Sequence, residues 1–123
     1  MPHAPAPAGH YSQATLAAGL VFVSGQLPLR PPSMEIPEGI EAQLIQAMKN
    51  VEHILLAAGS SLAKLVSVQL FIADVSLWPE VNRVYAQIMR SSKPARTIVP
   101  VGALHYGALI EINAIAEVAD HLD

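Results

Sequence analysis

The chain of 123 residues contains no cysteine. This absence excludes a disulfide scaffold, a thiol nucleophile and any metal site built on thiolates. The five histidines are scattered along the sequence, so we expect no metal site of another kind. A chain without cysteine also suits a reducing compartment, and we expect a cytoplasmic location.

Charge is scarce as well, at 14% of residues against 52% hydrophobic residues. So few charged side chains cannot cover the surface of a monomer well. We therefore expect part of the surface to be buried against other subunits. The net charge of −3 and the lack of a Lys/Arg cluster argue against a nucleic-acid partner. No apolar run approaches the roughly 20 residues of a membrane span, so we expect no membrane partner.

The remaining sequence predicts a single domain over residues 1–123, with residues 1–8 as a flexible lead-in that carries three prolines and no signal-peptide pattern. Hydrophobic periodicity predicts its elements in order. They are strands over 13–17 and 20–24, a helix over 40–58, a strand over 65–74, a helix from about 76 to 90, and strands over 95–101 and 109–118. This β-β-α-β-α-β order predicts a two-layer α+β fold, with two helices against one mixed sheet.

Local signals refine these elements. Gly25 is expected to end the second strand, Gly59 to adopt the left-handed conformation past the end of the first helix, and Ser76 to cap the second helix. Val66 is expected on the same face of its strand as Val68, and Pro100 indicates an edge strand or a bulge. The uncovered face of the sheet, with its apolar residues, is expected to pack in the core of an oligomer.

Six short patterns follow one another along the chain. They are Gly9-His10-Tyr11-Ser12-Gln13-Ala14, Val23-Ser24-Gly25-Gln26-Leu27-Pro28-Leu29, Ala57-Ala58-Gly59-Ser60-Ser61-Leu62, Val81-Asn82-Arg83-Val84-Tyr85, Lys93-Pro94-Ala95-Arg96-Thr97 and Ile110-Glu111-Ile112-Asn113-Ala114-Ile115-Ala116. In this order and spacing they resemble the RidA/YjgF family, also called the endoribonuclease L-PSP or imine deaminase family. The resemblance covers roughly residues 8–118.

The resemblance implies a chorismate-mutase-like homotrimer, in which the sheets form a central barrel and three clefts lie between subunits. It also implies the hydrolysis of reactive 2-imino and enamine acids to 2-keto acids and ammonia, without a cofactor. Such an activity protects pyridoxal-phosphate enzymes from reactive intermediates. Arg96 matches the family's substrate arginine and Glu111 its acidic residue. Other positions that line or support the cleft match Tyr11, Ser24, Gly25 and Asn82.

Elementary chemistry supports these roles. The guanidinium fork of Arg96 suits a planar carboxylate, which would fix the neighbouring imine carbon. Glu111 could orient or deprotonate the attacking water. Tyr11 could close the cleft or relay a proton, and backbone N–H groups near Gly25 and Ile98 could steady the carboxylate. Because an imine is already reactive, positioning alone supplies much of the effect.

Structural roles remain open for each of these residues. Arg96 and Glu111 could form an ordinary ion pair on neighbouring strands. Tyr11 could be an interfacial aromatic, Ser24 a strand-end cap, and Asn82 a structural hydrogen-bonding residue on the second helix. Gly25 could serve backbone geometry alone.

The chain also departs from the family pattern. His10 stands where proline is usual, and Ile98 replaces a frequent cysteine. The loop that contains His105 and Tyr106 differs from the usual Leu-Pro-Lys-Gly, so these two side chains could enter the cleft and change which imino acid fits.

Alternative functions are therefore a pathway-specific deaminase, for example on an aminomuconate- or aminoacrylate-like acid, and a non-catalytic regulatory trimer that binds small carboxylates. A ribonuclease activity is disfavoured by the acidic charge balance.

Overall fold

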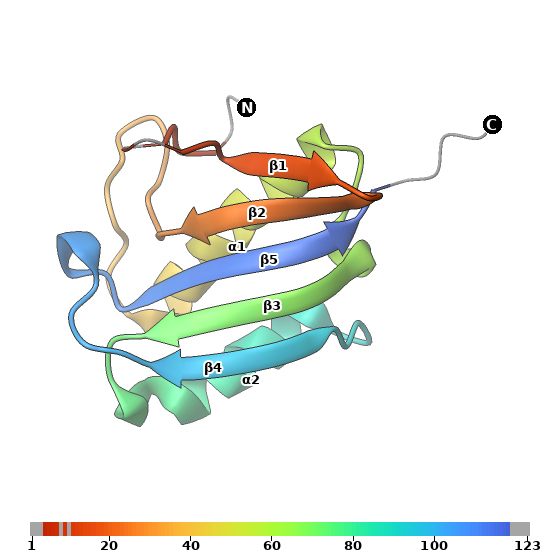
Figure 1. Ribbon diagram of the computed structural model, residues 1–123. Helices are drawn as coiled ribbons and strands as arrows, with labels where there is room; N and C mark the ends of the chain where they lie inside the picture. The colour runs from red at the N-terminus through yellow and green to blue at the C-terminus, as the bar shows by residue number, and fades with distance from the viewer. Residues whose placement is uncertain (1–3, 8, 10, 119–123) are drawn as a thin grey trace.

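One five-stranded sheet carries both long helices on the same face (Figure 1). The computed structural model describes residues 4–7, 9 and 11–118. The elements are β1 (Ala14–Ala17), β2 (Leu20–Gln26), α1 (Ile40–Ala57), β3 (Leu65–Ile72), α2 (Trp78–Met89), β4 (Ala95–Pro100) and β5 (Ile110–Glu117). Short 3₁₀ turns occupy Leu62–Lys64, Val75–Leu77 and His105–Gly107. The predicted element order and two-layer α+β fold are confirmed.

The strands lie in the order β1-β2-β5-β3-β4, which puts the last strand of the chain at the centre. Only β3 and β4 run parallel, because α2 forms the crossover between them. The other neighbouring strands are antiparallel. Pro100 ends β4 at the edge of the sheet, as expected for a residue that donates no backbone hydrogen bond.

The core lies between the sheet and the two helices. The alternate residues Ile110, Ile112, Ala114 and Ala116 of β5 point into it and are at most 3% exposed. Gly59 adopts the left-handed conformation that the sequence predicted past the end of α1. In the described part of the chain, no helix combines the length and the apolar character that crossing a membrane requires.

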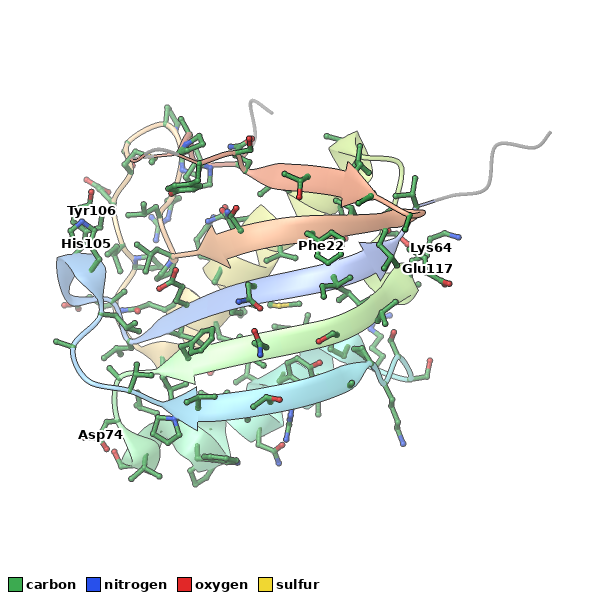
Figure 2. The ribbon with its side chains drawn as sticks, in the orientation of Figure 1. Phe22, Lys64, Asp74, His105, Tyr106 and Glu117 are labelled. Atoms are coloured by element: carbon green, nitrogen blue, oxygen red, sulfur yellow. The ribbon has the colours of Figure 1, made fainter. Side chains whose placement is uncertain are left out.

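The other face of the sheet is open and partly apolar. Phe22 on β2 is 39% exposed and stands out from this face in Figure 2. Phe71 and Ile115 on the neighbouring strands are half-buried. The predicted uncovered apolar face is therefore present.

Three local predictions are wrong, two of them because of pairing with a strand that is distant in sequence and the third because of a local cap. The second strand passes through Gly25 to Gln26, since an irregular register with β5 between Val23 and Gln26 absorbs the glycine. A second irregularity in β3 buries Leu65 and leaves Val66 44% exposed, on the face opposite to Val68.

Ser76 does not cap the second helix. Its backbone N–H donates a hydrogen bond of 2.8 Å to the Asp74 carboxylate, so Asp74 is the capping residue. The cap starts the 3₁₀ turn Val75–Leu77, and α2 follows with Pro79 in its first turn, where proline is tolerated.

Part of the expected lead-in contacts the rest of the protein. Ala4 is 5% exposed and belongs to the hydrophobic core, and the Gln13 side chain donates a hydrogen bond to the Pro5 carbonyl. Residues 1–3 and 8 of this segment lie outside the described residues.

Two buried amide side chains tie loops to α1. Asn50 donates to the carbonyls of Leu27 and Leu29 over 3.0 and 2.9 Å, and it accepts a hydrogen bond of 3.0 Å from Gln46. The backbone N–H of Leu109, just before β5, donates to Gln43 over 2.8 Å. Asn50 is fully buried, so its bonds replace those that water would otherwise make.

The substitution Asn50→Ala is expected to lower the free energy of unfolding by about 2–4 kcal/mol, because it leaves the Leu27 and Leu29 carbonyls without their partner. Urea denaturation measures the loss. The exposed neighbour Lys49 provides the control, since Lys49→Ala should change stability by less than about 0.5 kcal/mol. Equal effects of the two substitutions would contradict this role of Asn50.

Candidate functional site

A cavity of about 810 Å³ opens where β2 ends and β5 begins. Its size is that of a small-molecule site. Three of the predicted site residues line it together, namely Tyr11, Gly25 and Glu111. The other walls come from the lead-in, from the segment between β2 and α1, and from the turn His105–Gly107.

Glu111 reaches this cavity because of its place on β5. Its neighbours Ile110 and Ile112 are fully buried towards the helices, so Glu111 faces the opposite side of the sheet. A methyl group on Gly25 would overlap the Glu111 carboxylate oxygen and lie 3.1 Å from its carboxyl carbon. Gly25 does not adopt the left-handed conformation, so its role here is to admit the carboxylate.

Ser24 supports the neighbouring segment and does not line the cavity. Its hydroxyl donates a hydrogen bond of 2.6 Å to the Ser12 carbonyl, and its backbone N–H donates to the Gln13 carbonyl over 2.9 Å. These bonds fasten the segment that carries Tyr11 to β2. Tyr11 itself is 52% exposed at the rim, where a ligand can reach it.

Arg96 lies elsewhere, on the edge strand β4 against α2. Its Nη1 donates a hydrogen bond of 2.9 Å to the Asn82 side-chain oxygen. Its guanidinium carbon lies 5.1 Å from the centre of the Tyr85 ring, within the range of a cation–π contact. Both Arg96 and Asn82 are exposed, so the guanidinium group is held in place yet accessible.

Tyr85 is a supporting residue that the sequence did not identify beyond its place in an apolar stripe. It is 7% exposed, and its hydroxyl is the one buried side-chain polar atom in the described residues that lacks a hydrogen-bond partner. Burial raises the pKa of Tyr85, while the charge of Arg96 acts in the opposite direction. The spacing of Asn82 and Tyr85, three residues apart on one helix face, was the available signal.

Within one chain, Arg96 and Glu111 are far apart. Strand β3 lies between their strands, so the predicted alternative of an ion pair on neighbouring strands is wrong. Val68 of β3 is in register with Arg96 on one side, and Phe71 with Glu111 on the other. The two residues are therefore offset by roughly 10 Å along the strands and roughly 10 Å across them.

They also lie on opposite faces of the sheet. Arg96 contacts α2 on the helix-covered face, whereas Glu111 points away from the helices. Ile98, two residues after Arg96, is 7% exposed and packs in the core on the same side. Its side chain is therefore withdrawn from ligands, and only its backbone can take the predicted role.

No metal centre is visible in this arrangement. Among residues 4–7, 9 and 11–118, no three His, Asp or Glu side chains cluster closely enough to hold an ion. The cavity instead offers one carboxylate, a tyrosine at the rim and apolar walls. Such a lining suits a small organic molecule that reacts with water or exchanges a proton.

The fold and the cavity define a small α+β protein with a cavity of small-molecule size at one end of a mixed sheet. The family model described as Endoribonuclease L-PSP matches residues 1–118. The chain therefore belongs to this family, as the sequence motifs predicted.

Individual relatives agree with that membership. A RutC family protein of Pyrococcus horikoshii is 43% identical, over 93% of this chain and 91% of the relative. A 2-iminobutanoate/2-iminopropanoate deaminase of Bos taurus is 41% identical, over 92% of this chain and 83% of its own. The crystal structure of E. coli TdcF with bound serine superimposes with a TM-score of 0.91 at 33% identity, covering 97% of this chain and 96% of the other.

The contact between Gly25 and Glu111 predicts an energetic coupling. Gly25→Ala should lower the free energy of unfolding by about 1–3 kcal/mol, because the added methyl group displaces the carboxylate. In a Glu111→Ala background the same change should cost much less, since the obstructing side chain is gone. Urea denaturation of the four proteins of this double-mutant cycle gives the coupling. Additive effects would show that Gly25 is needed for another reason.

Proposed function

We propose that the protein is a hydrolytic deaminase that converts 2-imino acids, and the enamines in equilibrium with them, to 2-keto acids and ammonia. The observation that carries this proposal is the Glu111 carboxylate, held over Gly25 in a cavity of about 810 Å³. The bovine relative, a 2-iminobutanoate/2-iminopropanoate deaminase, supports the same reaction.

Water is the second reactant. Glu111 accepts a proton from a water molecule whose oxygen attacks the imine carbon, and the carbon–nitrogen π bond opens towards nitrogen. Glu111 then returns that proton to nitrogen, which gives a carbinolamine. The hydroxyl proton of the carbinolamine passes through Glu111 to nitrogen as the carbon–nitrogen bond breaks, so ammonia leaves and the water oxygen becomes the keto oxygen. Tyr11 at the rim covers the bound acid or relays a proton.

The substrate carboxylate binds Arg96. The hydrogen bond from Arg96 to Asn82 and the contact with the Tyr85 ring hold the guanidinium fork before the substrate arrives. Backbone N–H groups beside Gly25 and Ile98 give further donors. E. coli TdcF, a relative whose crystal structure contains bound serine, supports a small carboxylate ligand.

Because Arg96 and Glu111 lie on opposite faces of one sheet, one chain supplies only half of this site. We therefore assign the second half to a neighbouring copy, in a homotrimer whose sheets form a central barrel. The open face, with Phe22, Phe71 and Ile115 partly exposed, supplies apolar surface for such a barrel. Each cleft then combines Arg96 of one subunit with Glu111 of the next.

A second candidate function is the binding of small carboxylates without catalysis. The bound serine in the relative TdcF favours it, because an amino acid has no imine carbon for water to attack. Such a regulatory trimer would need Arg96 and would be indifferent to Glu111. A deaminase specialised for one pathway differs from the leading proposal only in the substrate that the cavity accepts.

The decisive assay couples an amino-acid oxidase to semicarbazide, which traps the released imine. The wild-type protein should divert the imine to keto acid. Arg96→Ala should lower kcat/KM by about 100-fold or more, because it removes a charged carboxylate partner. Glu111→Gln should lower kcat by about 100-fold or more while it still binds keto acids.

Matched controls separate these effects from general loss of charge. Glu117→Gln changes an exposed carboxylate on the same strand as Glu111. Arg83→Ala removes an exposed arginine whose ion pairs with Glu80 and Glu41 lie at the protein surface. Both variants should retain wild-type rates. Undiminished turnover by Glu111→Gln would reduce Glu111 to a structural role. Binding of keto acids by a wild-type protein that hydrolyses no imine would instead favour the carboxylate-binding function.

The composite site makes a separate prediction. Arg96→Ala and Glu111→Gln, each inactive alone, should regain activity when they are denatured together and refolded in equal amounts. Random assembly gives about a quarter of the clefts both native residues, since each comes from a different chain. The control is a mixture of the two folded variants that is not denatured, so their subunits do not exchange. No recovery in verified mixed oligomers would mean that both residues act from one chain.

A further inference from the structure

Much of the lining of the cavity that holds Glu111 is apolar. The segment between β2 and α1 contributes Leu27, Leu29, Met34 and Ile36 to this lining. None of these side chains has a role in holding the carboxylate or in activating water. The reaction at Glu111 therefore leaves this part of the cavity unexplained.

The turn before β5 adds two aromatic rings to the lining. His105 and Tyr106, which Figure 2 labels on this turn, both line the cavity, and their ring centres lie 3.8 Å apart. Tyr106 has a φ of +58°, a left-handed conformation that is unfavourable for a tyrosine, and it is 57% exposed. The turn thus holds a large, exposed ring in the cavity lining at some conformational cost. A ring held in this way can contact an apolar ligand.

Both walls are fastened to the same helix. Asn50 of α1 binds the carbonyls of Leu27 and Leu29, and Gln43 of α1 accepts the hydrogen bond of Leu109, which follows the aromatic turn. Both amides are buried, at 0 and 5% exposure. The walls are therefore preformed, so a ligand gains contact with them without first ordering them.

We propose that this space receives the side chain of the imino acid, and that it selects large apolar side chains, aliphatic, thioether or aromatic, over methyl and ethyl groups. This inference rests on the proposed function, whose carboxylate and imine sites it extends. A small acid such as 2-iminopropanoate would leave the apolar walls in contact with water. A larger side chain would displace that water and gain the free energy of burial.

The test compares imines of different size on the whole protein. Oxidation of alanine, leucine, methionine and phenylalanine supplies the imines, with the oxidase adjusted to equal rates of imine release. For the three larger imines we expect kcat/KM at least about tenfold above that for the alanine product, the range expected for apolar contacts in a pocket. Equal values, or a preference for the alanine product, would overturn the inference.

Substitution of Tyr106 tests whether its ring causes the preference for larger imines. Tyr106→Asn keeps a residue that tolerates the left-handed conformation and removes the ring. It should lower kcat/KM for the larger imines about fivefold or more and change kcat/KM for the alanine product little, so the preference falls by the same factor. Leu56→Ala, an exposed apolar change on α1 outside the cavity, should leave the preference unaltered. If the preference is undiminished in Tyr106→Asn, the aromatic wall is not its source.

Binding separates this inference from the proposed function. If no imine is hydrolysed, the deaminase proposal fails, and calorimetry with keto acids then decides the inference alone. Tighter binding of 4-methyl-2-oxopentanoate than of pyruvate, lost in Tyr106→Asn, would support the apolar subsite. Equal affinities for the two keto acids would overturn it.

Discussion

The alternation of side chains on β5 is the constraint on which the rest of the structure depends. This strand is central, paired on both sides, so a slip by one residue would exchange its two faces. Burial of Ile110 and Ile112 against the helices leaves Glu111 on the other face. The position of the proposed catalytic carboxylate is thus a consequence of core packing. Gly25 on the adjoining strand then provides the space that the carboxylate occupies.

The same alternation separates the two charged groups that the proposed chemistry needs together. Arg96 sits on the helix-covered face with Asn82 and Tyr85, and no side-chain rotation brings it round the sheet to Glu111. A monomer would hold a carboxylate in one place and a carboxylate receptor in another. Assembly is therefore part of the proposed mechanism, and the low charge of the chain is consistent with a surface largely given to subunit contact.

Periodic patterns were predictable from the sequence because they arise within one element. The helix over Ile40–Ala57 and the alternation of β5 are of this kind, and so is the left-handed Gly59. The irregular register at Gly25 and the reversed face of Val66 were not predictable, since each depends on pairing with a strand far away in sequence.

The candidate site also has a part that the sequence could predict and a part that it could not. Family motifs identified Glu111, Gly25 and Tyr11, which the fold brings to one cavity. They did not show that β3 separates Arg96 from Glu111, because strand order is a property of the whole sheet.

The rigidity of the cavity fits the chemistry proposed for it. An imine carbon is already electrophilic, so a catalyst gains most from holding it beside an oriented water and excluding other nucleophiles. Walls tied to α1 by Asn50 and Gln43 would hold the proposed substrate in this way. Flexible walls would accept more substrates but would lose binding free energy in becoming ordered. The buried amides therefore link the stability of the fold to the choice of substrate, since the contacts that secure the loops also define the space a side chain can fill.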